Sequence, residues 1–410
     1  MNFLKLKKII IFLFFDIWFF LLASLIILLI RTVLYSLPIR FGRVRSDVIG
    51  NGFFNLDCYL GEKKISSKKF YDFFCFNKII INKQFAIMAK RQLNIFWFVN
   101  YLEKMNKLIP GGSKNMVSPD DYRVSGYESG TDPTKIIQKT EQNIHFTKFE
   151  NDKGESYLTK TGLKKNDKFV CLIVRSGSYK KKYFAEWNID WSYHDYRNSE
   201  IKDYEEAINF LLNSGYWVFR MGKGESTPLK ISNKKFIDYA YSDDRQDFLD
   251  IWLMANCNFC ISSGTGLDDV SIAFRKPIVQ VNQIPIGGMR SYYSNILYIF
   301  KKLKKKGEQT FLTTTEIIDL NLTHAFRTNN YKEANVEIIN NSPQEIRSVT
   351  EEMHNKLVKE KAYDNNGEKN QKIFWEKIFS SKKFNTDGRW INEGCKIGSK
   401  FLTDNQFFLN

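Results

Sequence analysis

The residues best suited to chemistry lie in a turn of small residues at positions 262–266, within the segment 255–282. The turn follows one apolar run and precedes a short apolar stretch and a second run, so the pattern predicts a strand, a tight turn, a helix and a strand. Such a turn can present unpaired backbone N–H groups and a helix N-terminus to a phosphate. Taken alone, the turn could equally be an ordinary connection between a strand and a helix that binds no ligand. Its candidate phosphate contacts are Ser262, Ser263, Gly264, Thr265 and Gly266.

Arginines follow other predicted strands in the same half of the chain. Arg175 follows one apolar run, Arg220 ends the next, and Arg197 lies in a loop before a predicted helix. Right-handed crossovers bring the carboxyl ends of parallel strands to one edge, so these loops should converge with the glycine turn. A guanidinium fork can bind a diphosphate and neutralise a departing leaving group. We therefore expect Arg197 first, and then Arg175, Arg220 and Gly222, to contact the donor. Arginines paired with neighbouring carboxylates or exposed at strand ends are the alternative.

Four further polar residues are candidates for acid–base chemistry or for binding sugar hydroxyls. The ordinary pKa of a histidine is near neutrality, which makes His194 a candidate base. Asp47 and Asp57, in an N-terminal loop punctuated by glycines, are alternative bases for an acceptor hydroxyl. Asp269 follows the glycine turn, where a carboxylate suits a helix N-terminus or a sugar hydroxyl. A structural histidine and solvated loop carboxylates are the alternatives.

An alternation of apolar runs and amphipathic stretches must position these residues. From residue 169 onward the pattern is that of a parallel sheet with helices on both faces. We therefore predict an α/β chain with an N-terminal domain at 38–140 and a C-terminal domain at 165–360. A loop rich in Gly, Pro, Ser and Asp at 113–135 separates them. Residues 361–410 are predicted to be a linker with a C-terminal helix and tail, which could pack back on the N-terminal domain.

The N-terminus carries a long apolar segment. Residues 1–8 form a short basic tail, and residues 9–30 are apolar apart from Asp16 and Ser24. Roughly 20 such residues cross a bilayer, and no small-residue cleavage pattern follows, so the segment predicts a transmembrane signal anchor. A monotopic hairpin is the alternative. The arginine excess after the segment predicts a single-pass protein of the inner membrane with its catalytic body in the cytoplasm.

The composition narrows the class of partner. A formal net charge of +16 with 43% apolar residues fits a globular chain that meets an anionic membrane or an anionic substrate. No zinc-finger, RNP or basic-zipper pattern is present, so nucleic acid is not an expected partner. The chain has no Asp-x-Asp sequence, and its six cysteines are scattered. Neither a metal nor another cofactor is therefore expected.

A family resemblance is carried by two stretches, SYHDYRNSEIKDYEEAINFLLNSGYWVFRMG and DFLDIWLMANCNFCISSGTG…RKPIVQVN. Over roughly residues 38–357, the chain resembles a group of bacterial glycosyltransferases associated with surface-polysaccharide loci. More distantly, the stretch from Gly264 to Pro277 is similar to the D-T-G-P-M-H-x-A-A-x-G-K-P segment of heptosyltransferases, which are GT-B enzymes. The resemblance implies a GT-B-like fold, with two Rossmann-like domains facing a cleft and the nucleotide sugar held mainly by the C-terminal one.

The same resemblance implies a membrane-anchored, metal-independent glycosyltransferase. Its co-substrate would be a nucleotide sugar, and its acceptor a surface polysaccharide or a lipid-linked glycan on the N-terminal domain. Asn51 stands where the group has a histidine, and Ser176 where it has an aspartate. These departures leave one alternative, a non-catalytic, membrane-tethered protein that binds nucleotides or sugars. A pyruvyl- or phosphotransferase of surface glycans is a further alternative.

Overall fold

The computed structural model describes residues 16–117, 132, 135–177, 190–223, 228–359, 365–381 and 394–410. The chain divides into two compact units. Unit 1 comprises Met1–Gly130 and Asn143–His145, and unit 2 comprises Thr131–Gln142 and Phe146–Asn410. Most of the loop predicted at 113–135 lies outside the described residues.

Unit 1 is built on two parallel strands, β1 and β2, that pair residue by residue along their whole length. A helix, α3, connects them, and α5 packs against both. The helix α4 begins after Asn82, whose side chain accepts a hydrogen bond from Phe85 N at 2.9 Å, as an N-cap asparagine does. The described elements of unit 1 are α2 (Ile17–Thr32), β1 (Ile39–Val44), α3 (Ile49–Ile65), β2 (Tyr71–Phe76), α4 (Lys83–Gln92), α5 (Val99–Leu108) and a 3-10 turn at Gly112–Asn115.

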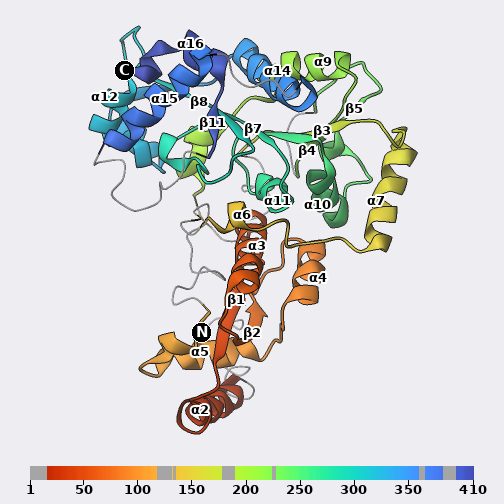
Figure 1. The fold of residues 1–410 in the computed structure, drawn as a ribbon, viewed down its shortest axis with the longest axis vertical. Helices are drawn as coiled ribbons and strands as arrows, with labels where there is room; N and C mark the ends of the chain where they lie inside the picture. Colours follow the sequence, from red (N-terminus) through yellow and green to blue (C-terminus); the bar gives the residue numbers. More distant parts are fainter. Residues whose placement is uncertain are drawn as a thin grey trace, which may run out of the picture. The chain divides into compact units, whose positions relative to one another are not determined.

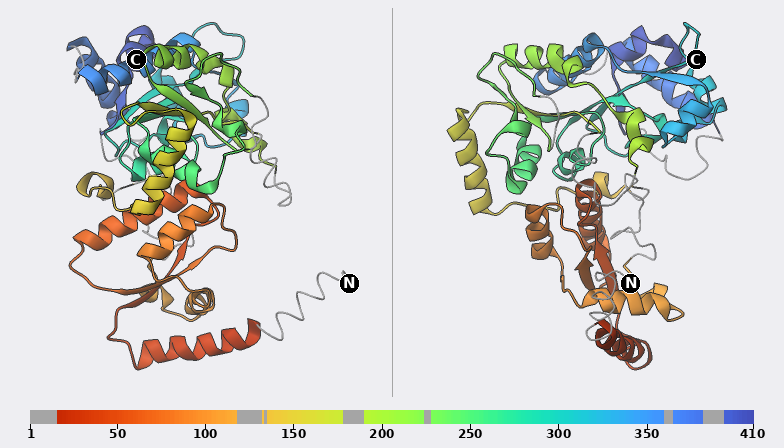
Figure 2. Two further views of the ribbon diagram at one scale, coloured as in Figure 1. Left: turned by 90° about the vertical axis from the view of Figure 1, so that its right-hand side faces the viewer. Right: turned by 180° about the vertical axis from the view of Figure 1, so that it is seen from behind.

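The helix α2 is an integral part of unit 1. Ala23, Ile27 and Ile30 are buried in one cluster with apolar residues of β1, β2 and α5. The guanidinium of Arg31 donates hydrogen bonds to Pro110 O at 2.7 Å and to Asn106 O at 2.8 Å. Figure 2 shows α2 crossing α5 at the edge of the unit. One face of α2 therefore belongs to the core of unit 1.

The predicted transmembrane segment is described only in part. The basic tail at 1–8 and residues 9–15 lie outside the described residues, and α2 begins after Asp16 and covers the rest of the segment. Among the helices of the described ranges, none has both the length and the apolar character needed to cross a bilayer.

Unit 2 contains a seven-stranded sheet in which every strand pairing is parallel. The strand order is β11-β8-β7-β6-β3-β4-β5. Helices α9 (Glu205–Asn213) and α14 (Pro343–Lys359) cover one face, and α10 (Asp247–Asn256) and α11 (Asp268–Ala273) the other (Figure 1). Cover on both faces explains why the central strands are apolar throughout. The predicted α/β class with a parallel sheet is confirmed. The strands are β3 (Phe169–Ile173), β4 (Trp217–Met221), β5 (Phe236–Ile237), β6 (Phe259–Ser262), β7 (Ile278–Gln283), β8 (Ile296–Phe300) and β11 (Lys396–Ile397).

The helices of unit 2 begin and end at local sequence signals. At the start of α14, Ser342 and Glu345 form a capping box: Glu345 N donates to Ser342 Oγ at 3.2 Å, and Ser342 N donates to Glu345 Oε2 at 2.8 Å. A separate antiparallel pair joins β9 (Lys302–Lys305) to β10 (Val336–Ile339). The described helices are α6 (Ile136–Lys139), α7 (Lys148–Thr161), α9 (Glu205–Asn213), α10 (Asp247–Asn256), α11 (Asp268–Ala273), α12 (Thr314–Asp319), α13 (Thr328–Glu333), α14 (Pro343–Lys359), α15 (Asn365–Ser380) and α16 (Ser399–Asp404).

The C-terminal tail belongs to unit 2. Its strand β11 extends the sheet beside β8. The amide of Gln371 fixes β11, because it donates to Ile397 O at 2.6 Å and accepts from Ile397 N at 3.1 Å. The described residues 394–410 therefore complete the sheet of unit 2.

Candidate functional site

The candidate site lies where four neighbouring parallel strands of unit 2 end. The strands β8, β7, β6 and β3 are adjacent, so their carboxyl ends share one edge of the sheet. Arg175 comes two residues after β3, the glycine turn follows β6, and Lys301 follows β8 directly. Gln280 of β7 pairs with Ser262, the last residue of β6. This edge thus brings together residues from four separate parts of the sequence.

A 3-10 segment, Ser192–Arg197, is held at this edge by hydrogen bonds to its backbone. Lys301 Nζ donates to Tyr196 O at 3.0 Å and to Asn198 O at 2.7 Å. Ser199 N donates to Arg175 O at 3.1 Å. The segment that carries Arg197 is therefore tied to the loops after β8 and β3.

Several donor groups converge around Gly264. Arg197 Nη2 donates to Gly264 O at 2.6 Å, and Arg175 N donates to Ser263 Oγ at 2.7 Å. Gly264 has a φ of +80°, and a Cβ at this position would lie 3.2 Å from both Arg197 Nη2 and Gln280 Nε2. The Nε atom of Arg175 and the Nε2 atom of Gln280 are buried without a hydrogen-bond partner among the described residues. Buried donors of this kind require a partner, which an oxygen-rich ligand can supply.

The positive charges of the site are only partly offset by carboxylates, because Asp268 and Asp195 counter the lowering of the Arg175 pKa in part. Burial, together with the neighbouring charges of Arg197 and Arg175, lowers the pKa of Lys301 to about 7. Burial and the charge of Arg197 lower the pKa of Arg175 to about 9. Within the described ranges, none of these three cations forms a salt bridge. An anion would relieve this repulsion, so the cluster Arg175, Arg197 and Lys301 is a candidate phosphate site, called here the cation cluster.

Binding of a nucleoside diphosphate to the cation cluster is expected to take up a proton at about pH 8. Lys301 is largely neutral there in the free protein, because its pKa is about 7, and a bound phosphate favours its charged form. The affinity should therefore fall as the pH rises from about 7 to about 9. Calorimetric titration in two buffers with different ionisation enthalpies measures the uptake. Equal heats of binding in both buffers would show that no proton is taken up. Undiminished proton uptake in the variant Lys301→Met would show that another group takes it up. Either result would contradict the assignment to Lys301.

The glycine turn satisfies most of its own N–H groups. Gly264 N donates to Ser262 Oγ at 3.1 Å, Thr265 N donates to Asp268 Oδ2 at 3.1 Å, and Leu267 N donates to Thr265 Oγ1 at 3.3 Å. The expectation of unpaired N–H groups is wrong for these three residues. Gly266 completes the turn before α11, which has only six residues. The turn therefore contributes space and a carbonyl to the site, and the side chains of other segments contribute the positive charge.

Two carboxylates after the turn are neutralised by an arginine that the sequence patterns did not single out. Arg290 contacts Asp268 at 3.1 Å and Asp269 at 2.7 Å, and all three residues are largely buried. Burial raises the pKa of Asp269 to about 7; the charge of Asp268 adds to this, and Arg290 and Arg197 oppose it. Asp268 also closes the turn by accepting a hydrogen bond from Ser262 Oγ at 2.7 Å. This arrangement holds the turn in shape.

Arg220 is engaged away from the cation cluster. Its guanidinium pairs with Asp238 at 3.1 Å and lies over the ring of Tyr241, 5.6 Å from the ring centroid. Asp238 follows the edge strand β5, so the structure pairs Arg220 with the outer strands of the sheet. Gly222 directly follows β4, the strand that ends with Arg220 and Met221, so it lies on this outer side as well.

The three predicted bases have different surroundings. His194 lies in the same 3-10 segment as Arg197, with its ring 4.0 Å from that of Tyr193. Asp47 in unit 1 pairs with Arg45 at 3.0 Å and is half-buried. Asp57 was expected in a loop, but it lies inside α3, fully buried, and accepts a hydrogen bond from Asn143 Nδ2 at 3.0 Å. The loop assignment of Asp57 is therefore wrong, because the glycines around it are helical.

The chain is similar to several solved structures, but it matches no known protein family. No protein-family model matches the chain, and neither does any curated protein. A glycosyl transferase family 9 protein from Veillonella parvula is similar over 79% of this chain and 98% of its own, with 9% identity and a TM-score of 0.45. The E. coli ADP-heptose lipopolysaccharide heptosyltransferase II is similar over 79% of this chain and 100% of its own, with 13% identity and a TM-score of 0.39. The iron-containing dodecameric glycosyltransferase TibC of enterotoxigenic E. coli is similar over 80% of each chain, with 14% identity and a TM-score of 0.40.

All three TM-scores lie below 0.5. The resemblance to the surface-polysaccharide group stays a prediction.

Proposed function

We propose that the chain is a GT-B-like glycosyltransferase whose unit 2 binds the diphosphate of a nucleotide sugar at the cation cluster. The observation that carries this proposal is the convergence of buried Lys301 and half-buried Arg175 and Arg197 at one sheet edge without an ion pair among the described residues. The buried amide of Gln280 adds a donor to the same place. The resemblance of the glycine-turn segment to heptosyltransferases supports a nucleotide sugar as the diphosphate ligand.

The chemistry requires stabilisation of a leaving group. When the bond between the sugar and the diphosphate breaks, the bridging oxygen gains negative charge, and fixed cations lower the free energy of that transition state. Arg197 is placed for this role because one arm of its guanidinium is already held by Gly264 O. We assign the reaction no metal or other cofactor, and we keep His194 and Asp47 as the candidate bases. The burial of Asp57 against Asn143 makes it the least suited.

The proposed acceptor is a surface polysaccharide or a lipid-linked glycan, bound through unit 1 at the cytoplasmic side of the inner membrane. The apolar segment at 9–30 supports attachment to a membrane. The exposed leucines of α2 support it as well, since water-exposed apolar surface of this extent favours a lipid or protein partner.

A donor panel tests the proposed function. The full chain would be incubated with UDP-, GDP-, ADP- and CMP-linked sugars, with ATP and with phosphoenolpyruvate, and hydrolysis or transfer measured. Consumption of a nucleotide sugar is the expected result. Binding of nucleoside diphosphates without turnover would instead favour a non-catalytic binding protein. Consumption of phosphoenolpyruvate or ATP would favour a pyruvyl- or phosphotransferase.

Replacing Gly264 with valine is expected to abolish nucleoside diphosphate binding. The side chain would occupy the space between Arg197 and Gln280 and would strain a residue with a φ of +80°. Gly215→Val is the matched control, because Gly215 has a φ of +89° with no atom within 4 Å of an added Cβ, and it follows α9. Both variants carry the backbone strain, so equal loss of binding in both would show that strain and not the site is responsible.

A further inference from the structure

The helix α2 has two apolar faces, of which only one is covered by unit 1. Ala23, Ile27 and Ile30 lie in the core. The opposite stripe is open to solvent, with Trp18 68% and Leu25 66% exposed. Its spacing of three and four residues places the stripe along one side of the helix. The exposed side chains are Trp18, Leu21, Leu22, Leu25, Leu28 and Leu29.

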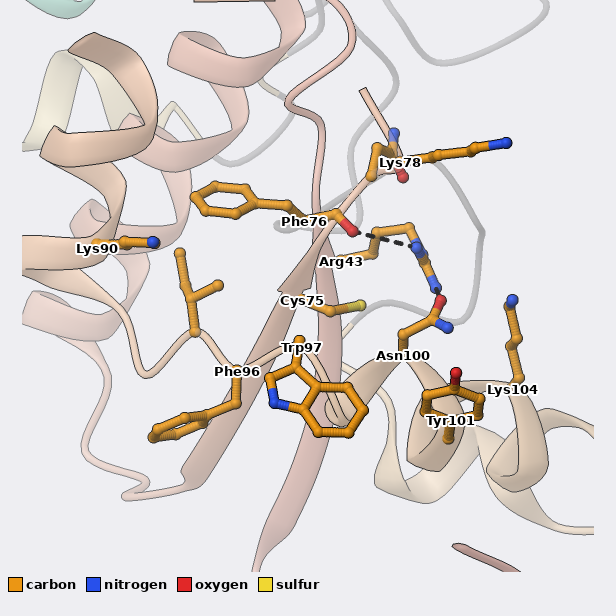
Figure 3. A pocket seen from close by; sticks show the side chains of 12 residues that line it. Arg43, Cys75, Phe76, Lys78, Lys90, Phe96, Trp97, Asn100, Tyr101 and Lys104 are labelled. Atoms are coloured by element: carbon orange, nitrogen blue, oxygen red, sulfur yellow. Dashed lines mark hydrogen bonds between the residues drawn. The ribbon is translucent and has the colours of Figure 1, made fainter. Parts of the chain in front are cut away.

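A basic cavity of about 670 Å³ lies next to this helix, between the end of β2, the loop after α4, and α5. Lysines and aromatic rings line it, and none of its lining residues is acidic. Figure 3 shows Lys78 and Lys104 extending on the side where Arg43 and Asn100 are hydrogen bonded. Lys90 lies on the other side of Phe76 and Cys75. The cavity thus carries two ammonium groups on one side of Phe76 and a third on the other.

The ammonium groups of Lys78 and Lys104 in the cavity have no carboxylate partner within the described ranges. Arg43 is neutralised by the buried carboxylate of Glu103, which also accepts a hydrogen bond from Lys107 at 2.6 Å. Lys90 faces the ring of Phe76, 5.9 Å from its centroid. These ammonium groups are therefore available to an anion.

Aromatic residues connect the cavity to α2. Trp97 lines the cavity, is 65% exposed, and meets the ring of Phe19 edge-on at 5.1 Å. Tyr101 also lines the cavity and donates a hydrogen bond to Asp16 at the start of α2. Tryptophan and tyrosine with an apolar body and a polar tip favour the headgroup region of a bilayer. The basic cavity thus adjoins α2 through Phe19 and Asp16, which are half-buried and lie outside the open stripe. The cavity and the stripe together are called here the membrane surface of unit 1.

We propose that this surface of unit 1 binds the face of an anionic phospholipid bilayer. The open stripe of α2 enters the acyl region parallel to the membrane plane, and the cavity takes the phosphate of an anionic headgroup. The buried face of α2 favours this orientation, because a helix packed along its length on a folded unit presents only its other side to lipid. This inference rests on the membrane attachment proposed above and is independent of the sugar transfer.

Vesicle flotation of the full chain tests the headgroup site. Vesicles of phosphatidylcholine are compared with vesicles in which a third of the lipid is phosphatidylglycerol. The triple variant Lys78→Gln, Lys90→Gln, Lys104→Gln should lose the preference for phosphatidylglycerol. At low salt, its partition coefficient onto these vesicles should fall roughly fivefold for each lysine replaced. The matched control removes the same charge elsewhere in unit 1, with Lys63→Gln, Lys64→Gln and Lys69→Gln, and should lose less.

A preference for phosphatidylglycerol that survives the triple variant, or equal binding to both vesicles by the unaltered chain, would overturn the headgroup site. Glycerol phosphate in solution should not displace the chain from the vesicles; displacement would identify a free phosphate as the ligand. Nucleoside diphosphate binding by the triple variant should be unchanged, so failure here is distinguishable from failure of the proposed transferase.

The orientation of α2 is tested with a fluorophore attached through Leu21→Cys. All six native cysteines are buried, so the label is selective. In a helix that lies in the interface, the fluorophore is quenched best by lipids brominated near the headgroup. Stronger quenching by lipids brominated near the acyl chain ends would overturn the in-plane orientation, because position 21 is near the middle of the apolar segment at 9–30.

Discussion

Replacing Arg197 with alanine is expected to lower kcat/KM for the nucleotide-sugar donor by about 30- to 1000-fold, equivalent to ~2–4 kcal/mol of transition-state stabilisation. The guanidinium is oriented by its hydrogen bond to Gly264 O at 2.6 Å, and it shares the site with Arg175 and Lys301. Its loss removes a fixed positive charge from the place where the departing diphosphate gains negative charge. Most of the loss should appear in kcat, since that charge develops in the transition state.

Arg197→Lys should restore little of the activity. An ammonium group is a point charge, and it cannot both hold Gly264 O and present a planar fork to phosphate oxygens. Arg347→Ala on the exposed face of α14 is the control and should leave the kinetics unchanged. Steady-state kinetics with the donor found by the panel provides the measurement. Unchanged donor affinity and turnover in Arg197→Ala would move the phosphate site away from this residue.

The sheet of unit 2 and part of its site can be predicted from short-range patterns. A strand buried on both faces must be apolar throughout, so runs such as those ending before Arg175 and before the glycine turn identify adjacent strands. Parallel pairing then places the loops after these strands at one edge. The same rule applies to Lys301, which directly follows the apolar strand β8. Lys301 was missing from the expected site because β8 was not predicted as a strand. Gln280 carries a weaker signal, a polar residue inside an apolar strand.

Other features of the site depend on contacts that spacing does not encode. Arg220 also lies at a strand end, but it forms an ion pair with Asp238, which follows the neighbouring strand β5. The N–H groups of the glycine turn are taken by Ser262 and Asp268, a local pairing that competes with a ligand. Arg290 reaches Asp268 across 22 positions of sequence. Tertiary packing decides which side chain meets which partner, and no periodicity in the sequence reports it.

The helix α2 shows the same limit for an apolar segment. Hydropathy identifies residues that avoid water, and the segment at 9–30 satisfies that criterion on all sides. Hydropathy does not distinguish lipid from protein as the partner of each face. In α2 the side with Ala23 and Ile27 is covered by unit 1, while the side with Leu25 is open. The small side chain of Ala23 on the covered side is the one sequence signal of close helix packing.

Arg290→Met is expected to destabilise the chain by about 3–5 kcal/mol near neutral pH, because it leaves two buried carboxylates without their counter-charge. Arg290 contacts Asp268 at 3.1 Å and Asp269 at 2.7 Å, and Asp268 is fully buried. Methionine fills a similar volume, so the loss of charge and not a cavity dominates the effect. The midpoint of urea unfolding gives the change in the free energy of unfolding.

The loss in Arg290→Met should depend on pH in a defined direction. Burial already raises the pKa of Asp269 to about 7 in the presence of Arg290, and removing the arginine raises it further. A carboxyl group whose pKa is higher in the folded than in the unfolded state stabilises the fold at low pH, and this contribution is lost as the pH rises through the folded pKa. The variant should therefore be closer in stability to the unaltered chain at about pH 5 than at about pH 8. Asp269→Asn, added to Arg290→Met, removes one of the two orphaned charges and should recover part of the loss at the higher pH. A loss that is equal at both pH values, and that Asp269→Asn leaves unchanged, would mean that Arg290 acts through packing rather than through its charge.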